Sequence, residues 1–165
     1  MLGIARGITK NTMKALLKYV LSASIIGTFG GPTQANGQLA QHAFGKLSRF
    51  YEDIQAGRLE AAMALYAADA QVILPGQSPV VGKEAIRAWW AGTLSAFEFR
   101  LTPELTEAAD LAGAVMLRGR TVGSLISKKD GSVVPVDIWF MQIYRREPDG
   151  SYLFWRGASG ANPSR

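Results

Sequence analysis

The stretch of sequence that decides the fold is residues 44–94, FGKLSRFYEDIQAGRLEAAMALYAADAQVILPGQSPVVGKEAIRAWWAGTL. Its apolar side chains first recur at helical spacing, through Leu47, Phe50 and Ile54. This spacing predicts an amphipathic helix whose apolar stripe faces a core. We expect the helix to end at Gly57, because glycine readily adopts the left-handed conformation that closes a helix.

The remainder of the stretch predicts a second helix, a short strand and a third helix. A brief apolar stripe over residues 59–66 indicates the second helix, and the β-rich segment 71–74 indicates the strand. The third helix is expected over Lys83–Ser95. Asp53 is placed on the solvated face of the first helix, and Asp69 is interpreted as a turn or capping residue.

Beyond residue 95 the apolar period changes from about 3.6 to 2, which is the period of a strand. Strands are predicted over residues 97–102, 111–127, 133–146 and 152–157. Gly119 and Gly123 indicate bulges or bends within the second of these. Helices followed by a run of hairpin-connected strands predict an α+β fold, with three N-terminal helices packed on a strongly curved, mainly antiparallel sheet.

The length and the distribution of charge predict a single domain preceded by a leader segment. At 165 residues a single domain is expected, and we assign residues 1–35 to a signal peptide and residues 36–165 to the domain. The net charge of +5 does not indicate nucleic-acid binding, because four of the 18 basic side chains and none of the 13 acidic ones lie in residues 1–35. The domain itself is therefore nearly neutral.

The leader has the three parts of an export signal. Basic residues precede the apolar run Tyr19–Phe29, and small side chains at Thr33 and Ala35 predict cleavage before Asn36. The run is too short to span a bilayer, so we expect a periplasmic or secreted protein without membrane attachment after cleavage. The alternative is an uncleaved amphipathic or membrane-anchoring helix.

The sequence does not predict a metal or another cofactor. It has no cysteine, and its single histidine, His42, cannot by itself form the zinc or copper sites that His and Cys clusters form. Without cysteine there is also no disulfide framework, so the core must supply the stability.

Three segments resemble a known family: Ala56-Gly57-Arg58-Leu59-Glu60, then Ala64-Leu65-Tyr66-Ala67-Ala68-Asp69-Ala70, and Gly82-Lys83-Glu84-Ala85-Ile86. Their order resembles the SnoaL-like and ketosteroid-isomerase-like branch of the nuclear transport factor 2-like superfamily, over residues 41–162. The resemblance implies a cone-shaped α+β barrel with a pocket between helices and sheet. It does not imply one function, because isomerases, cyclases, dehydratases and non-enzymatic association domains share this fold.

The chemistry of the isomerases in that branch can be tested on this sequence. They use a carboxylate base before the proline that ends the first strand, a tyrosine on the first helix and a protonated aspartic acid, and that enzyme is a standard worked example of pKa tuning. Here the base position is Leu74 and the tyrosine position is Phe50, and only Asp137 matches. Leucine cannot accept a proton and phenylalanine cannot donate one, so ketosteroid-type isomerisation is not expected. Tyr51, one residue further along the helix, is a poor substitute.

Asp137 is the one candidate catalytic residue. It shares a strand face with Trp139 and Met141, and if this face is concave, its carboxyl group lies in apolar surroundings that raise the pKa. The alternative is a structural carboxylate paired with Arg118 or Arg120. The predicted ligand-binding residues are Phe50, Met63, Tyr66, Leu74, Trp89, Trp139 and Met141.

Three functional hypotheses remain open from the sequence. The first is an exported domain that binds a small apolar molecule, without assured catalysis. The second is a small-molecule isomerase, cyclase or lyase that uses Asp137, and the third is a non-enzymatic oligomerisation or interaction module. Because the strand 133–146 is apolar on both faces, we also expect a homodimer that covers the face turned away from the helices.

Overall fold

The computed structural model describes residues 34–162. Residues 1–33, which hold most of the predicted signal peptide, lie outside this part, so cleavage and export stay predictions. The described elements are the helices α2 (Gln34–Gln55), α3 (Leu59–Met63) and α4 (Lys83–Ala96), and the strands β1 (Tyr66–Ile73), β2 (Val80–Val81), β3 (Phe97–Asp110), β4 (Ala114–Ser127), β5 (Val133–Arg146) and β6 (Tyr152–Ala161).

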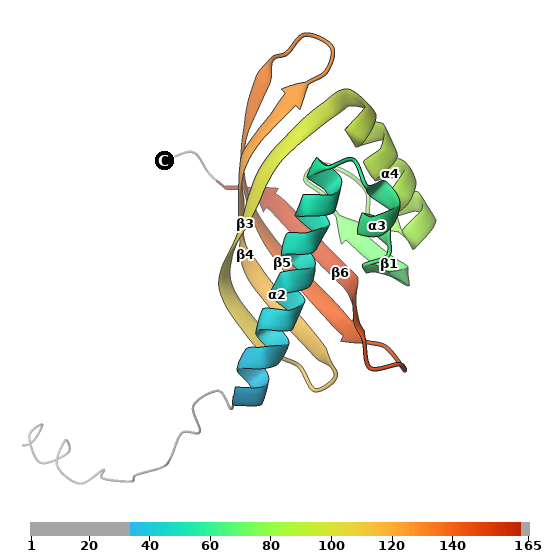
Figure 1. The fold of residues 1–165 in the computed structure, drawn as a ribbon, viewed down its shortest axis with the longest axis vertical. Coiled ribbons are helices and arrows are strands. Elements are labelled where there is room, and N and C mark those ends of the chain that lie inside the picture. Colours follow the sequence, from blue (N-terminus) through green and yellow to red (C-terminus); the bar gives the residue numbers. More distant parts are fainter. Residues whose placement is uncertain (1–33, 163–165) are drawn as a thin grey trace, which may run out of the picture. The chain divides into compact units, whose positions relative to one another are not determined.

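The strands form one curved sheet in the order β2-β1-β6-β5-β4-β3. All neighbours are antiparallel except β1 and β6, which pair in parallel. Figure 1 shows α2 lying across the sheet, with α3 and α4 beside it. The predicted α+β fold is confirmed, and the sheet is mixed.

Helix α2 buries the stripe that its sequence predicts. Leu47, Phe50 and Ile54 are all buried in the core, together with Tyr51. The helix ends at the predicted glycine, where Gly57 has a φ of 71° and the Arg58 amide donates to the Asp53 carbonyl across 2.8 Å. This is the left-handed helix stop that the sequence indicates.

The prediction of a solvated Asp53 is wrong. Its side chain is only 2% exposed, and it accepts hydrogen bonds from Arg49 at 3.1 Å and from Arg58 at 2.8 Å. The chain reverses after Gly57 and packs α3 against α2, and this covers the end of α2. The two guanidinium groups compensate the buried carboxylate, because a buried charge is tolerated when it is paired.

The second helix is shorter, and the first strand longer, than the sequence predicts. Helix α3 ends at Met63, and β1 begins at Tyr66 beside Phe154 of β6. Asp69 is therefore a strand residue and not a turn or cap. Its carboxylate accepts hydrogen bonds from Arg145 at 3.0 and 3.1 Å.

Strand β4 carries the two glycines that indicate bends. A β-carbon at Gly119 would overlap the carbonyl oxygen of Glu104, and one at Gly123 would overlap that of Arg100. The register shift on β3 lies between Leu105 and Glu107, opposite Gly119 and its neighbour Arg118. These glycines let β4 approach the backbone of β3 closely along the strongly curved part of the sheet.

Strand β5 runs over the predicted residues and separates two faces. Phe140 and Tyr144 are buried on the face toward α2, whereas Trp139 and Met141 are each 43% exposed on the opposite face. A strand alternates its side chains between faces, so every other residue of β5 follows this division. Among residues 34–162, no helix has the length and apolar character needed to cross a membrane.

Candidate functional site

A cavity of about 310 Å³ lies between the helices and the inner face of the sheet. Helix α2 contributes Phe50 and Tyr51 to its wall, α4 contributes Trp89 and Trp90, and β5 contributes Gln142 among other residues. No Asp, Glu, Lys, Arg or His of residues 34–162 lines it. The cavity is thus an apolar, uncharged space with a few hydroxyl and amide groups, as ligand pockets commonly are.

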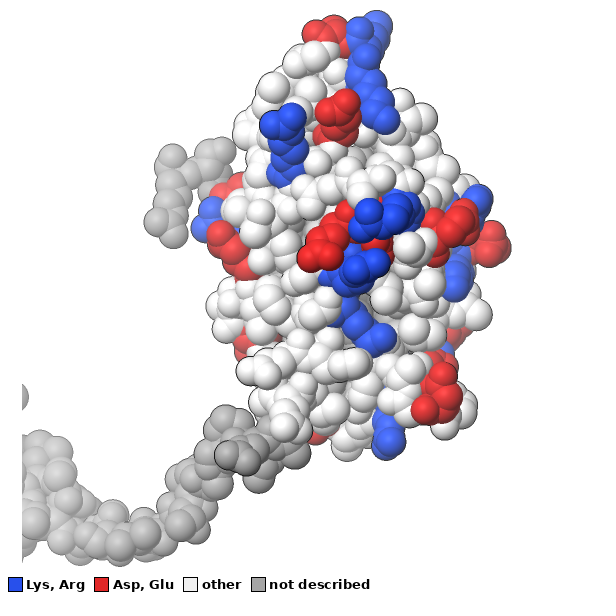
Figure 2. All heavy atoms as spheres, viewed as in Figure 1, with Lys and Arg blue, Asp and Glu red and all other residues white. Residues whose placement is uncertain are grey.

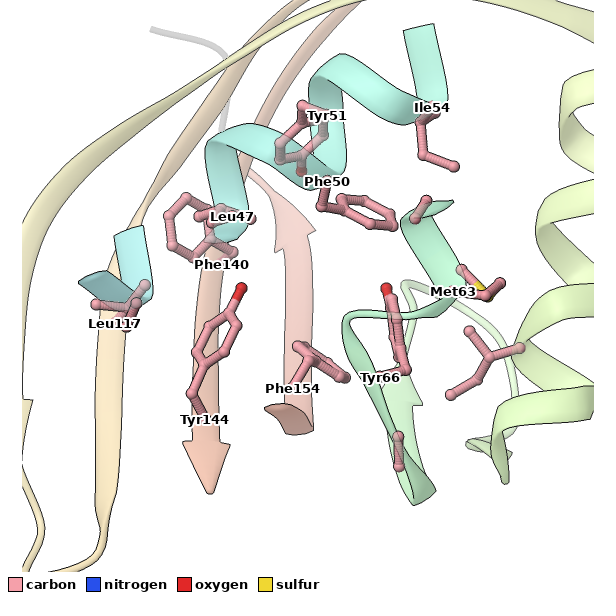
Figure 3. Close-up of a cluster of buried hydrophobic side chains, with 14 of the residues drawn as sticks. Leu47, Phe50, Tyr51, Ile54, Met63, Tyr66, Leu117, Phe140, Tyr144 and Phe154 are labelled. Carbon is pink, nitrogen blue, oxygen red and sulfur yellow. The ribbon is translucent and has the colours of Figure 1, made fainter. Parts of the chain in front are cut away.

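Aromatic rings form the side of the cavity next to α2. The ring of Phe50 packs edge to face against Tyr51, Tyr66 and Trp90, with centroids 5.4, 5.6 and 5.2 Å apart. Figure 3 shows Phe154 between Tyr66 and Tyr144, and the hydroxyl groups of both tyrosines directed toward α2. Edge-to-face packing fixes these rings and gives the cavity a defined wall.

Two hydrogen bonds join polar groups at the inner face of the sheet. The hydroxyls of Tyr51 and Thr121 lie 3.0 Å apart, and Thr121 is fully buried. The hydroxyl of Tyr144 donates to Oε1 of Gln142 across 3.0 Å. Tyr51 and Gln142 also line the cavity, so these bonds position polar groups at its wall.

The tyrosines of this region are neutral phenols. Burial raises the pKa of Tyr51 above its ordinary value, and the hydrogen bond with Thr121 opposes this shift less strongly. Burial likewise raises the pKa of Tyr66 and Tyr144 well above the usual range. Such hydroxyls can donate or accept hydrogen bonds at neutral pH, but they do not act as bases there.

The cavity includes four of the seven predicted ligand-binding residues. Phe50, Tyr66, Leu74 and Trp89 line it. Met63 is instead part of the core, with 1% of its surface exposed. The structure thus places Phe50 and Leu74, which occupy the isomerase tyrosine and base positions, in the wall of the cavity, where neither can transfer a proton.

Trp139 and Met141 do not line the cavity, because the face of β5 that the sequence suggested as concave is the outer face. The inner face carries Val136, Ile138 and Gln142. Both faces of β5 are largely apolar, so alternation alone could not decide which face turns inward.

Asp137 is likewise on the outer face of β5 and does not reach the cavity. Its side chain is 52% exposed and lies 3.2 Å from the Arg120 guanidinium. The side-chain amide of Asn162 donates to it across 2.6 Å, and the Asn162 backbone amide donates to its carbonyl across 3.1 Å. Of the two interpretations of Asp137 that the sequence left open, the structure shows a surface carboxylate paired with Arg120 and not a carboxyl group in an apolar pocket.

Tyr51 and Gln142 are cavity residues that the sequence did not predict. Tyr51 is 100° around the helix from Phe50, but the curved sheet covers enough of α2 for both rings to reach the cavity. The sequence does distinguish Gln142, because it is the one amide in the alternating apolar series that includes Ile138 and Phe140. A polar residue at an inward position of a strand indicates either a structural hydrogen bond or a site.

Charges gather outside the cavity as balanced pairs. Asp69 meets Arg145, and Arg118 and Arg120 meet Glu107 and Asp137 on the outer face. Figure 2 shows acidic and basic side chains side by side on the visible face, without a broad area of one sign. Within residues 34–162, no group of three or more acidic or histidine side chains is arranged to hold a metal ion.

Comparison with known proteins identifies the family. The family model for the SnoaL-like domain matches residues 47–153. Comparison with curated proteins gives no match.

Several solved structures share the fold. A ketosteroid isomerase-like protein from Erwinia carotovora atroseptica has a TM-score of 0.69 and 19% identity, over 76% of this chain and 97% of its own. A conserved protein from Planctomyces limnophilus has a TM-score of 0.66 and 18% identity, over 76% and 98%. A candidate dehydratase of the NTF2-like family from Streptomyces avermitilis has a TM-score of 0.65 and 17% identity, over 78% and 99%. At these identities the likeness concerns the fold alone.

Proposed function

Because the chain belongs to the SnoaL-like domain family, we propose that its domain binds a small, largely apolar molecule in the cavity between helices and sheet. The observation that supports this is the cavity itself, about 310 Å³ of space with an uncharged, mainly aromatic wall. An apolar space of this size is larger than the packing defects of an ordinary core. An apolar molecule entering it would remove both its own surface and the wall from water.

The proposal is for binding and not for proton transfer. General acid–base catalysis needs a group of suitable pKa within hydrogen-bond reach of the reacting atom. No carboxylate or imidazole of residues 34–162 lines the cavity. An isomerase, cyclase or lyase that uses Asp137 is not supported, because Asp137 lies outside the cavity and is paired with Arg120.

Filling the cavity tests the binding proposal. We expect Val136→Phe, on the cavity side of β5, to weaken naphthalene binding by about tenfold or more, because the added ring occupies the space and overpacks the wall. Titration calorimetry of the purified full chain measures the affinity. Native mass spectrometry of protein from its own host provides a second readout, in which the variant loses a ligand that copurifies with the wild type.

The matched control is Val134→Phe, the same change two residues away at a position that is 47% exposed. It should bind naphthalene like the wild type. Equal affinity of the two variants, or no binding by the wild type, would contradict the proposal.

We also propose that two copies of the chain pair through the outer face of the sheet. Trp139 and Met141 present apolar surface there, and Ile73 on β1 adds to it with 45% exposed. The Trp139 indole lies over Gly160 of the neighbouring strand, where the missing side chain leaves room for it. Exposed apolar surface framed by ion pairs such as Arg120–Asp137 is typical of a protein interface.

A further inference from the structure

The side-chain amide of Gln142 is the polar feature of the cavity that the binding proposal leaves unexplained. It lines the cavity on β5 and lies directly opposite Gly157 of β6. Burying an amide on an apolar face is costly unless its groups find partners. A role of this amide in ligand selectivity rests on the proposed binding function, because the amide can select among ligands only if the cavity binds them.

One hydrogen bond fixes how this amide is turned. Tyr144 is buried, and its hydroxyl donates to Oε1 of Gln142 across 3.0 Å. Within residues 34–162 this is the one side-chain hydrogen bond of that hydroxyl. If the amide turned over, an NH₂ group would face the hydroxyl, and the phenolic proton would lose its acceptor. The amide is therefore held with its oxygen toward Tyr144 and its nitrogen away from that hydroxyl.

The nitrogen of the same amide is available to a ligand. Nε2 of Gln142 makes no hydrogen bond with residues 34–162, whereas every fully buried side-chain nitrogen and oxygen there has a partner. Nε2 is therefore reachable from open space, and the space that Gln142 borders is the cavity. It contributes N–H donors and no acceptor.

The part of β6 next to Gln142 carries small residues along the cavity. Gly157 leaves space for the ring of Phe154, because a β-carbon at this position would lie 2.6 Å from that ring and 3.5 Å from Cγ of Gln142. Ala158 and Ser159, the next residues of β6, also line the cavity and are small. A polar atom of a ligand can thus approach the amide beside these residues.

Two hydroxyl groups of the wall are already paired with protein groups, whereas those of Tyr66 and Ser159 lie in the same wall. The Thr93 hydroxyl donates to the Trp89 carbonyl across 2.9 Å, and the Tyr51 hydroxyl is paired with Thr121. No charged side chain of the described residues lines the cavity. A carboxylate or ammonium group would therefore be buried without a counter-charge, which is strongly unfavourable.

We infer that the cavity selects a neutral, ring-containing molecule that carries a hydrogen-bond-accepting oxygen, such as a ketone or ester carbonyl, and that Gln142 Nε2 donates to this oxygen. The aromatic wall supplies most of the affinity, and the amide supplies the selectivity. Gln142 is then a specificity-determining residue held in position by Tyr144.

Three naphthalenes of similar size test the inference by titration calorimetry on the full chain. We expect 2-acetylnaphthalene to bind about tenfold tighter than 2-ethylnaphthalene, which is the effect of one well-placed buried hydrogen bond. We expect 2-naphthoate to bind more weakly than the ketone by about a hundredfold or more.

Two variants assign the preference to Gln142. The double variant Gln142→Leu with Tyr144→Phe removes the amide without leaving a phenol unpaired, and its ketone-to-ethyl affinity ratio should fall to about one. The single variant Tyr144→Phe keeps the amide and should retain a preference for the ketone.

The outcomes separate the two claims. If no naphthalene binds the wild type, the proposed binding function fails and the inference fails with it. If the ketone and the ethyl compound bind equally, or if the double variant keeps the ketone preference, the role of Gln142 is wrong while the binding function stands. Tight binding of 2-naphthoate would likewise overturn the neutral-ligand requirement.

Discussion

Asp69 shows how the surface charges of this domain contribute to its stability. The Arg145 guanidinium and, secondarily, the Trp155 indole N–H donate to its carboxylate and lower its pKa to about 2. Folding lowers the pKa of this carboxyl group, so its ionised form stabilises the native state fully at pH values above the unfolded pKa, near 3.8. This contribution is lost as the pH falls toward 2.

We therefore expect Asp69→Asn to lower the free energy of unfolding at pH 7, and the deficit to shrink between about pH 4 and pH 2. The side chain is 55% exposed, so the deficit should stay below about 1 kcal/mol. Urea unfolding of both proteins at several pH values measures it. The control is Glu52→Gln at an exposed position, which should change the free energy of unfolding at pH 7 by less than about 0.5 kcal/mol. A deficit for Asp69→Asn that grows toward pH 2 would contradict the ion-pair account.

At the scale of residues, the sequence predicts which apolar side chains are buried better than it predicts which polar side chains are buried or line the cavity. Phe50 and Leu74 line the cavity, because helical spacing for Phe50 and strand position for Leu74 specify an inward face. Tyr66 also lines it, although the sequence placed it on a helix and the structure places it at the start of β1.

Asp53 was misplaced because helical spacing does not show how the chain folds back after Gly57. For Asp137 the sequence offered the pairing with Arg120 as an alternative, but alternation alone could not decide which face of β5 turns inward. Arg58 lies beyond a chain reversal from Asp53, and Arg120 lies on the neighbouring strand from Asp137.

At the scale of elements, Gly123 determines how β3 and β4 lie together. Its φ is 142°, and an added β-carbon would overlap the Arg100 carbonyl oxygen. Because the obstacle is backbone, a side chain cannot simply move aside. We expect Gly123→Ala to reduce the free energy of unfolding by about 2 kcal/mol or more, measured by urea unfolding.

Gly92 in α4 is the matched control for Gly123. It lies in a helix, and a β-carbon added to it would have no other atom within 4 Å, so Gly92→Ala should raise the free energy of unfolding by about 0.5–1 kcal/mol. If both alanine variants had the same sign of effect, the close approach at Gly123 would not be the cause of its cost.

Local elements were predicted more accurately than elements that depend on distant pairing. Helix α4 and strand β5 follow the predicted bounds to within one residue, because their periodicity and turn residues are local. The start of β1 was missed because its parallel partner, β6, lies about 80 residues further along the chain. The residues before Gln71 form strand through that pairing and not through a strong local preference.

At the scale of the whole molecule, the exposed outer face of the sheet is the feature that an isolated domain does not explain. Its centre carries Trp139 and Met141, while the ion pairs of Arg118 and Arg120 lie beside it on β4. A second copy would meet this face with the same residues, since a two-fold dimer uses one patch on both subunits. Apolar contact would then supply affinity, and the ion pairs would lie toward the rim.

We expect the full chain to sediment as a dimer, at twice its 17.8 kDa, and Met141→Lys to raise the dimer dissociation constant by about tenfold or more. The reason is that the variant places an unpaired ammonium group in apolar contact. Val133→Lys, which introduces the same side chain at a position 63% exposed near the strand end, should leave the dimer intact. Naphthalene affinity should be unchanged in both variants, because neither position lines the cavity. A wild-type chain that sediments as a monomer at tens of micromolar would contradict the proposed dimer and leave the binding proposal untouched.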